Sequence, residues 1–334
     1  MNIVAIFQKV FAYSFSRLKM LALLRMPRWF IIALLAMPLS ACNTLPNKPE
    51  DAVQTKTPDN RADIQHQPEP VKRKFLRKVA LVLGGGGARG FAHVGVIKAL
   101  EAQGIVPDII VGTSVGSAVG ALYASGLNGF QLQELSIPMR EGSVIDWSWP
   151  NRGIFTGKSL EEFINRMVNQ KPLEKLQRTF AVVATDLKTG EEIVFRTGNT
   201  GLAVRASCAV PGLFQPTVIN GRSYVDGGLV RPVPVSEARS LGAEFVIAVD
   251  ISNKPENNST ESTTEVLMQT FDIMSQSINR YELPKADVVI RPVTKEIDQG
   301  NLDGRHTAIL EGEKAAAAVM VEIKTKLQKL GEGR

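Results

Sequence analysis

Short apolar runs alternate with longer amphipathic or small-residue segments from residue 79 onward. The continuous apolar runs predict buried strands at 79–83, 109–111, 180–185, 192–195, 245–250 and 288–290. Spacing and composition predict helices at 91–103, 117–124, 159–168, 266–278 and 307–330, and a short helix from 204 that ends at Pro211. The order strand, helix, strand, helix over residues 79–124 predicts a parallel sheet with helices on both faces. We therefore expect an α/β fold: a three-layer α/β/α arrangement with a mostly parallel central sheet.

The first 41 residues have a different pattern, that of an export signal. Arg25 and Arg28 lead into an apolar run at 29–37, which is too short to span a bilayer because spanning takes about 20 helical residues. Leu39-Ser40-Ala41-Cys42 follows, so a basic region, an apolar region and a small-residue cleavage site occur in order. These four residues resemble the lipobox of bacterial lipoproteins, in which the cysteine is acylated and becomes the new N-terminus.

The lipoprotein resemblance implies lipidation at Cys42 and export to the cell envelope. Asn43, in place of aspartate, implies sorting to the outer membrane, on its periplasmic side. A plain cleaved signal peptide with an incidental cysteine is the alternative. The long basic region leaves Met1, Met20 and Met26 all open as the start of the chain.

Residues 42–75 are polar and rich in proline, and they cannot bury enough surface to fold. We expect the lipidated cysteine and a flexible tether there, after a signal peptide at 1–41. The main core is expected at 76–250, and the helices and strand at 251–334 are expected to complete the same domain. Such a tether would let the domain reach a bilayer surface.

The formal net charge of +6 arises almost entirely in the N-terminal segment, because residues 1–41 contain five basic and no acidic residues. The rest of the chain is therefore nearly neutral, and its charge does not favour nucleic-acid binding. With Cys42 lipidated, Cys208 is the remaining cysteine, so no intrachain disulfide is expected. The sequence contains no metal-ligand cluster, and no metal or other cofactor is expected.

The segment from Ile109 to Ala124 is the first candidate for chemistry. Three β-branched residues lead into Gly112-Thr113-Ser114-Val115-Gly116, and a small-residue helix follows. A strand that enters a helix through G-x-S-x-G is the nucleophile-elbow pattern, in which the glycines permit a very sharp turn. Such a turn would present Ser114 Oγ beside a helix N-terminus. An ordinary glycine-rich turn is the alternative for this segment taken alone.

A glycine-rich loop, Gly84-Gly85-Gly86-Gly87-Ala88-Arg89-Gly90, connects the first strand to the first helix. It matches the dinucleotide fingerprint, but the second strand ends without the acidic residue that binds a ribose. Consecutive glycine amides can instead converge on a developing oxyanion. Because the loop and the elbow follow successive strands, we expect both at one sheet edge, which favours an oxyanion hole. His93 lies on the helix beyond the loop, and we interpret it as a packing or surface residue.

A predicted hairpin ends in Asp226-Gly227-Gly228, which places a carboxylate at a strand end with little steric cover. Asp186 also ends a strand, but a turn-forming role fits it better. Cys208 lies among small residues and is expected to pack as a small apolar group. Trp147 and Trp149 are expected in the core.

Four motifs now occur in order: the glycine loop at 84–90, the G-x-S-x-G segment at 112–116, Arg205-Ala206-Ser207-Cys208-Ala209-Val210-Pro211-Gly212, and Asp226-Gly227-Gly228. Together they resemble the patatin-like phospholipase family over about residues 79–250. The resemblance implies a catalytic dyad without histidine, with Ser114 as nucleophile and Asp226 as base. It implies hydrolysis of lipid acyl esters, and it assigns the oxyanion loop to Gly85, Gly86, Gly87 and Arg89.

Two other functions are compatible with these residues. An α/β-hydrolase triad would combine Ser114, an acid and a histidine that follows both in the sequence. His306 is the only histidine after Ser114. A lipoprotein that binds lipid or a partner without turnover is the non-enzymatic alternative. Anchoring by acylated Cys42 would place the domain beside membrane lipid, which favours lipid over soluble esters as substrate.

Overall fold

The computed structural model describes residues 78–139, 146, 155–257, 260–294, 297 and 302–332. All of them belong to one compact unit that spans residues 67–334. The predicted export signal, Cys42 and the tether lie outside the described residues, as do Trp147 and Trp149. The predictions made for these segments therefore stay predictions.

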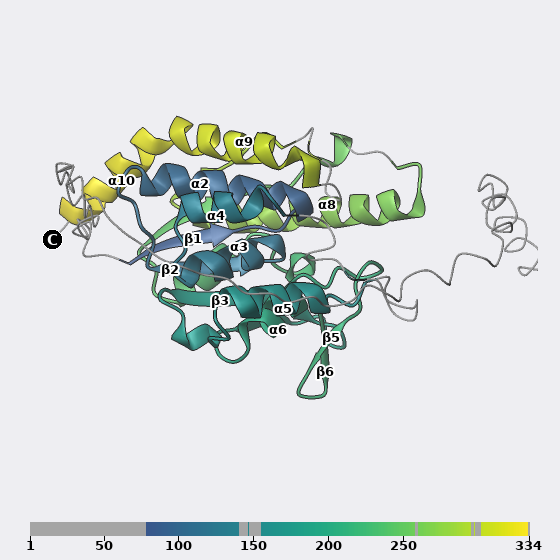
Figure 1. The fold of residues 1–334 in the computed structure, drawn as a ribbon. Coiled ribbons are helices and arrows are strands. Elements are labelled where there is room, and N and C mark those ends of the chain that lie inside the picture. The colour runs from purple at the N-terminus through teal and green to yellow at the C-terminus, as the bar shows by residue number, and fades with distance from the viewer. Residues whose placement is uncertain are drawn as a thin grey trace, which may run out of the picture. The chain divides into compact units, whose positions relative to one another are not determined.

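The described residues form a mixed sheet of eight strands (Figure 1). In chain order the strands are β1 Val79–Leu83, β2 Ile109–Thr113, β3 Thr179–Asp186, β4 Glu192–Phe195, β5 Thr217–Ile219, β6 Arg222–Asp226, β7 Phe245–Val249 and β8 Val288–Ile290. Across the sheet the order is β5-β6-β3-β2-β1-β7-β8, and β4 also pairs with β3. The five strands from β3 to β8 in this order are parallel, whereas β4, β5 and β6 pair antiparallel. The predicted α/β fold with a mostly parallel central sheet is confirmed.

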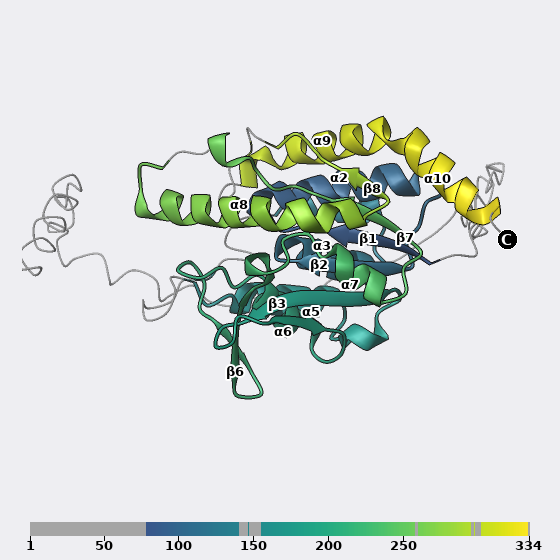
Figure 2. The same cartoon turned by 180° about the vertical axis from the view of Figure 1, so that it is seen from behind.

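Helices cover both faces of this sheet. Those in the described part of the chain are α2 Phe91–Glu101, α3 Val115–Ala124, α4 Gly129–Ser136, α5 Lys158–Met167, α6 Thr200–Ser207, α7 Val235–Ser240, α8 Thr263–Glu282, α9 Arg305–Ala318 and α10 Met320–Glu332. Figure 1 shows α2, α3, α5 and α9 on the near face, and the reverse view in Figure 2 brings α7 and α8 to the front. None of the helices described is both long and apolar enough to cross a membrane.

Alternate residues of the central strands face two separate cores. In β1, Val79, Leu81 and Leu83 pack in the core beneath α2 and α9, while Ala80 and Val82 pack in the core beneath α7. Burying one leucine side chain fully contributes about 1.5–3 kcal/mol. Burial on both faces explains why these strands are continuous apolar runs in the sequence rather than alternating ones.

The C-terminal segment is packed onto the main core. Strand β8 extends the parallel sheet beside β7, and α9 lies along α2. A Cβ atom at Gly95 of α2 would lie 1.9 Å from Ile309 O, and one at Gly312 of α9 would lie 2.0 Å from Ala92 O. The two glycines therefore let the helix backbones approach closely, and α9 completes the layer that covers this face.

Helix ends differ from prediction where capping overrides the apolar pattern. The helix predicted at 266–278 begins earlier, because Ser262 and Glu265 form a capping box at the start of α8. The helix predicted at 307–330 is two helices, α9 and α10, which meet at Val319, where φ is −105° and ψ is 6°. Neither α4 nor α7 was predicted, because both are short and their apolar spacing is weak.

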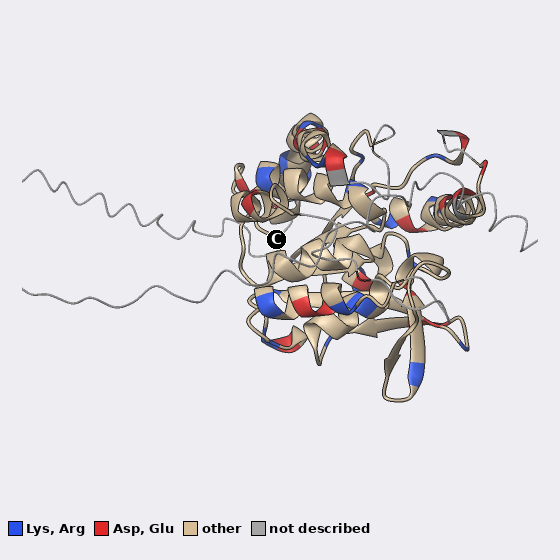
Figure 3. Ribbon diagram, turned by 45° about the vertical axis from the view of Figure 1, so that its right-hand side comes forward, with Lys and Arg blue, Asp and Glu red and all other residues tan. Residues whose placement is uncertain are grey.

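Charged residues of both signs are mixed over the elements seen in Figure 3, as the near-neutral composition of the body suggests. On α5, for example, Lys158 and Arg166 flank Glu161 and Glu162. The described surface thus carries the balanced charge that was expected for residues 42 onward.

Candidate active site

The predicted elbow is a tight turn between β2 and α3. Ser114 precedes α3 with φ 52° and ψ −129°, a conformation that is strained for a residue with a side chain. A Cβ atom at Gly116 would lie 2.1 Å from Leu83 O, and one at Gly112 would lie 2.5 Å from Gly116 O. Only glycine fits at either position, so the motif lets helix and strand come this close. Ser114 itself is partly exposed.

A chain of hydrogen bonds holds the elbow against β3. The Ser114 N–H donates to Ser207 Oγ at 2.8 Å, and Ser207 Oγ donates to Val183 O at 2.6 Å. On the helix side, Ser117 Oγ donates to Ser114 O at 2.6 Å. Ser207 therefore positions the backbone of Ser114. No role was predicted for Ser207 itself, although it belongs to the third motif.

Asp226 lies at the end of β6 and is 4% exposed. Its Oδ1 accepts a hydrogen bond from Gly228 N–H at 2.7 Å, and its carbonyl accepts one from Thr185 Oγ1 at 2.8 Å. Its own N–H donates to Ala209 O at 3.0 Å. The second carboxylate oxygen, Oδ2, is buried, and no described residue gives it a hydrogen bond of standard geometry. The carboxylate is thus fixed in place with one oxygen left available.

The two predicted dyad residues meet because β3 lies between their strands. It pairs in parallel with β2, which ends at the elbow, and antiparallel with β6, which ends at Asp226. Burial raises the pKa of Asp226 to about 6, and the nearby Ser114 hydroxyl and the hydrogen bond from the Gly228 N–H oppose the rise. Such a carboxylate is ionised at neutral pH yet is a stronger base than one with an ordinary pKa of about 4.

The glycine loop lies beside the elbow at the same sheet edge, as expected. A Cβ atom at Gly85 would lie 3.2 Å from Ser114 Cβ. The Gly85 N–H donates to Pro232 O at 3.0 Å, so this amide is not available to a substrate. The N–H groups of Gly86 and Gly87 have no acceptor among the described residues, and Gly87 is exposed with φ 59°. Of the predicted oxyanion-loop glycines, Gly86 and Gly87 therefore carry the open donors.

Arg89 points inward and supports this loop. It is 1% exposed, and both its backbone N–H and its Nε donate to Gly86 O, at 3.3 Å and 3.0 Å. Its Nη2 lies 3.5 Å from Asp272 Oδ1 on α8. Burial lowers the pKa of Arg89, and the charge of Asp272 opposes this. The side chain thus ties the loop to α8, while its role toward an oxyanion stays a prediction.

His93 is a fully buried residue of α2 rather than a surface residue. Its Nε2 lies 2.8 Å from Gly84 O. Because a carbonyl oxygen only accepts, Nε2 carries the proton and donates. Burial lowers the pKa of His93 to about 4, so the imidazole is neutral at physiological pH. The interpretation as a packing residue is confirmed, and the hydrogen bond adds that His93 also anchors the start of the glycine loop.

The remaining candidate residues are Asp186, Cys208 and His306. Asp186 Oδ1 accepts from Lys188 N–H at 2.8 Å and from Thr189 N–H at 3.1 Å, as expected for a turn residue. Burial and the charge of Asp226 raise the pKa of the Cys208 thiol. His306 is exposed, and no interaction among the described residues joins it to Ser114. Within the same residues, no group of three or more His, Cys, Asp or Glu side chains is placed to hold a metal ion.

Comparison with known proteins gives a consistent match. Residues 81–239 match the family model for patatin-like phospholipases. Human patatin-like phospholipase domain-containing protein 6 is 36% identical over 188 residues, which are 54% of this chain and 14% of that protein. Lysophospholipase NTE1 of Kluyveromyces lactis is 36% identical over 199 residues, which are 55% of this chain and 14% of that protein.

Two further proteins are similar to this chain. An uncharacterised NTE family protein of Mycobacterium tuberculosis is 33% identical over 202 residues, 60% of this chain and 56% of that protein. The chain thus spans between 14% and 56% of the length of these curated relatives. VipD from Legionella pneumophila has 14% identity and a TM-score of 0.49, over 74% of this chain and 67% of that one. The matched region at 81–239 contains the glycine loop, the elbow and the Asp226 motif. Over this region, the chain is similar to the patatin-like phospholipase family.

Proposed function

We propose that this protein is a serine hydrolase that cleaves the acyl esters of lipids through a Ser114–Asp226 dyad. The observation that carries the proposal is the meeting of three features at one sheet edge. Ser114 sits on a strained, partly exposed elbow. Asp226 is a buried carboxylate whose pKa is raised to about 6 and which interacts with the Ser114 hydroxyl. Gly86 and Gly87 supply backbone donors that the fold itself does not use.

The chemistry follows from these positions. Asp226 accepts the Ser114 proton as Oγ attacks the ester carbonyl, and the resulting oxyanion accepts hydrogen bonds from Gly86 and Gly87. The tetrahedral intermediate collapses to a Ser114 acyl-enzyme, and Asp226 returns the proton to the leaving alcohol. A water molecule, deprotonated by Asp226, then releases the fatty acid and restores the serine.

The largest contributions come from the oxyanion donors and the base. One preorganised donor lowers the barrier by about 3–4 kcal/mol. A positioned base contributes about 100- to 10,000-fold, and it is most effective when its pKa is near the working pH. The N-terminus of α3, directly behind Ser114, adds a favourable partial charge for the developing anion.

The relatives support the substrate class. One of them is named a lysophospholipase, and the family model carries the name phospholipase. We extend this to acyl esters of phospholipids, lysophospholipids and neutral lipids for the present chain. No cofactor enters the scheme, because Ser114, Asp226 and the glycine amides supply each group that it requires.

The decisive experiment is mass spectrometry of products released from a mixed bacterial lipid extract by the wild type and by Ser114→Ala. We expect free fatty acid and deacylated lipid from the wild type alone. Labelling by a fluorophosphonate probe should disappear in Ser114→Ala, which a non-catalytic lipid-binding protein would not show. Identical product profiles for the two proteins would overturn the hydrolase proposal.

The choice of base has its own test. Asp226→Asn should abolish esterase activity, while His306→Ala should leave it unchanged, because His306 is exposed and makes no interaction with Ser114 among the described residues. The reverse result would replace the dyad by a Ser-Asp-His triad.

We also propose that the enzyme is an exported bacterial lipoprotein, acylated at Cys42 and held at the periplasmic side of the outer membrane. The support is the lipobox-like sequence before Cys42 and the polar segment after it. Metabolic labelling with a palmitate analogue should mark the wild type and not Cys42→Ala. Labelling of both proteins, or fractionation of the wild type away from the outer membrane, would contradict this assignment.

A further inference from the structure

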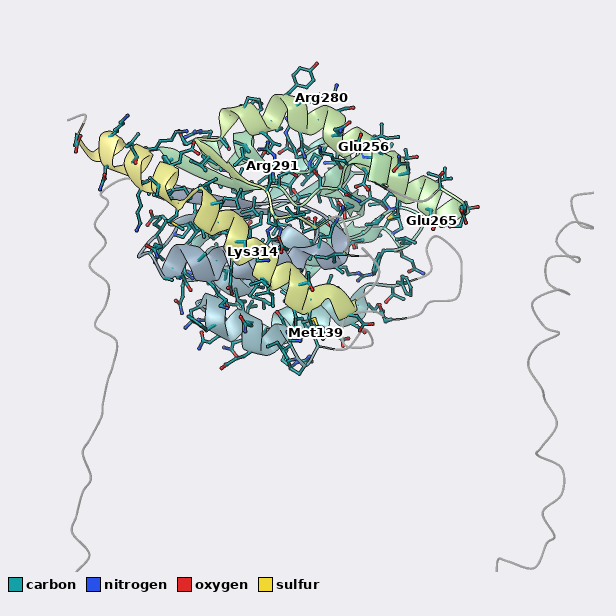
Figure 4. All side chains as sticks on the ribbon, turned by 90° about the horizontal axis from the view of Figure 1, so that it is seen from above. Met139, Glu256, Glu265, Arg280, Arg291 and Lys314 are labelled. Carbon is teal, nitrogen blue, oxygen red and sulfur yellow. The ribbon has the colours of Figure 1, made fainter. Side chains whose placement is uncertain are left out.

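A pocket of about 970 Å³ lies between α8 and the ends of β7 and β8. It is lined from α8 by Gln276, Asn279 and Arg280 and from the segment after β8 by Arg291. In Figure 4, Arg280 marks the α8 side, and Arg291 lies on the neighbouring segment after β8. The pocket is separate from Ser114, and nothing in the reaction scheme above uses it.

The floor of the pocket contains a polar side chain that lacks a partner. Asn279 is 4% exposed, and neither its amide nitrogen nor its amide oxygen makes a hydrogen bond to a described residue. A buried donor or acceptor left unpaired costs about 1–3 kcal/mol. Buried polar groups without partners mark places where a ligand or water completes the structure. Because Asn279 both donates and accepts, a hydroxyl group matches it well.

The rim of the pocket is cationic. Lys254 and Arg280 are exposed there, and within the described residues neither forms an ion pair. Arg291 has a partner, since its Nε lies 3.6 Å from Asp250 Oδ2. Exposed Glu256 is the one other acid among the lining residues described. Two unpaired cations above a buried amide fit an anion that also bears a hydroxyl group.

Two structural elements connect this pocket to the glycine loop. Asp250 and Ser252 line the pocket, and Ile251 between them lies against the loop, where a Cβ atom at Gly86 would be 2.9 Å from Ile251 Cδ1. On α8, Asp272 pairs with Arg89, which holds Gly86 O, and Gln276 lines the pocket one helical turn later. The segment at 250–252 and helix α8 thus each contact the loop beside Ser114 and also contribute residues to the pocket.

We propose that this pocket binds the phosphate-bearing polar head group of the lipid whose acyl ester is cleaved at Ser114. The proposal rests on the proposed function and narrows its substrates to phospholipids and lysophospholipids. Arg280 and Lys254 donate to the phosphate oxygens, since cations make the stronger hydrogen bonds to phosphate. Asn279 exchanges hydrogen bonds with a head-group hydroxyl, such as that of glycerol.

The test compares two substrates that share an acylglycerol and differ in the phosphoglycerol head group: palmitoyl lysophosphatidylglycerol, which has it, and monopalmitoylglycerol, which lacks it. Arg280→Ala should reduce kcat/KM for the phospholipid about tenfold, because a hydrogen bond to a charged group contributes at least about 1.4 kcal/mol. Its activity on monopalmitoylglycerol should be unchanged. Asn279→Leu, which removes the unpaired amide with little change in volume, should also reduce activity on the phospholipid alone, without lowering Tm.

The matched control is Lys314→Ala, which removes one exposed positive charge from α9, away from the pocket (Figure 4). It should leave both activities unchanged. Equal losses on both substrates in Arg280→Ala, or the same loss in Lys314→Ala, would overturn the assignment, as would no loss in either pocket variant.

A binding measurement separates this inference from the proposed function. Inactive Ser114→Ala should bind lysophosphatidylglycerol more tightly than monopalmitoylglycerol, and Arg280→Ala added to it should abolish the difference. That result would support the pocket even if the wild type hydrolysed neither lipid. If glycerol 3-phosphate bound as tightly as the lysophospholipid, the pocket would instead be assigned to a small free phosphate ester. Equal binding of lysophosphatidylglycerol and monopalmitoylglycerol would overturn the proposed head-group pocket.

Discussion

At the scale of the residue, the proposed mechanism requires Asp226 to be ionised so that it can accept the Ser114 proton. The carboxyl is buried, and its pKa is raised from its ordinary value to about 6. The cause is desolvation, which disfavours the charged form more than the Ser114 hydroxyl and the hydrogen bond from Gly228 favour it. This burial costs stability, and in the proposed mechanism it gives Asp226 a pKa suited to a base at neutral pH, a compromise that is common at active sites.

Esterase activity should therefore fall as pH drops through about 6, and Asp226→Asn should abolish it at every pH. Because the folded-state pKa is raised, the folded protein binds this proton more tightly than the unfolded chain does. Stability should decrease as pH rises from about 4 to about 6. Asp226→Asn should remove that decrease and raise Tm at pH 8. A variant Tm below that of the wild type would rule out desolvation of the carboxylate as the cause.

His93 is a positioning residue for the glycine loop through its hydrogen bond to Gly84 O. His93→Leu should lower kcat about tenfold with little change in KM, because small displacements of catalytic groups reduce rates strongly. His93→Gln, which keeps an N–H donor, should recover part of that loss. The measurement is steady-state hydrolysis of p-nitrophenyl butyrate. Equal kcat values for His93→Leu and the wild type would show that this bond does not position the loop.

At the scale of the element, the segment between β6 and α7 links the end of β2 to a cluster of carboxylates. The carbonyl of Arg231 accepts from Thr113 Oγ1, one residue before Ser114, at 2.7 Å. Arg231 Nε lies 3.0 Å from Glu192 Oε2 and 3.1 Å from Glu237 Oε1. One guanidinium thus anchors the segment that holds the end of β2.

This cluster predicts a loss of activity and stability at high pH. Burial, together with the hydrogen bond and charge of Glu237, raises the pKa of Glu192 to about 8, while Arg231 opposes the rise and Glu282 adds to it. A raised folded-state pKa means that the associated stability is lost as pH rises through about 8. Glu282 is itself paired with Lys285 at 2.6 Å.

The wild-type Tm should decline as pH rises from about 4.5 to about 8, and kcat should decline as Glu192 ionises near pH 8. Both declines should be much smaller in Glu192→Gln, which cannot ionise. The measurements are thermal unfolding and initial rates across this pH range. The same decline in both proteins would place its cause elsewhere in the molecule.

At the scale of the whole molecule, α9 joins the C-terminal segment to the sheet by lying directly on α2. Gly312→Ala would place a Cβ atom 2.0 Å from Ala92 O, so the helices must separate. The free energy of unfolding in urea should fall by about 1–3 kcal/mol. Gly331→Ala is the matched control, because its Cβ would meet nothing within 4 Å. Loss of stability in the control alone, or in neither variant, would refute this close packing of α9 on α2.

Local sequence determined much of the fold and part of the candidate site. Continuous apolar runs predicted the parallel strands, because burial on both faces leaves no polar positions. The G-x-S-x-G spacing predicted the strained turn at Ser114, because local sterics admit only glycine around it. Helix ends at α8 and α9 were less predictable, since caps and packing outweigh apolar spacing there.

Only the tertiary structure decided which of these segments contact one another. The register of β3 between β2 and β6 brings Asp226 to Ser114, and long-range hydrogen bonds determine that Gly85 is bonded while Gly86 and Gly87 are open. The support from Ser207, and the pocket beside α8, likewise depend on partners distant in the chain. A residue's local pattern sets its backbone conformation, but its hydrogen-bond partners and its desolvation come from contacts that only the folded chain makes.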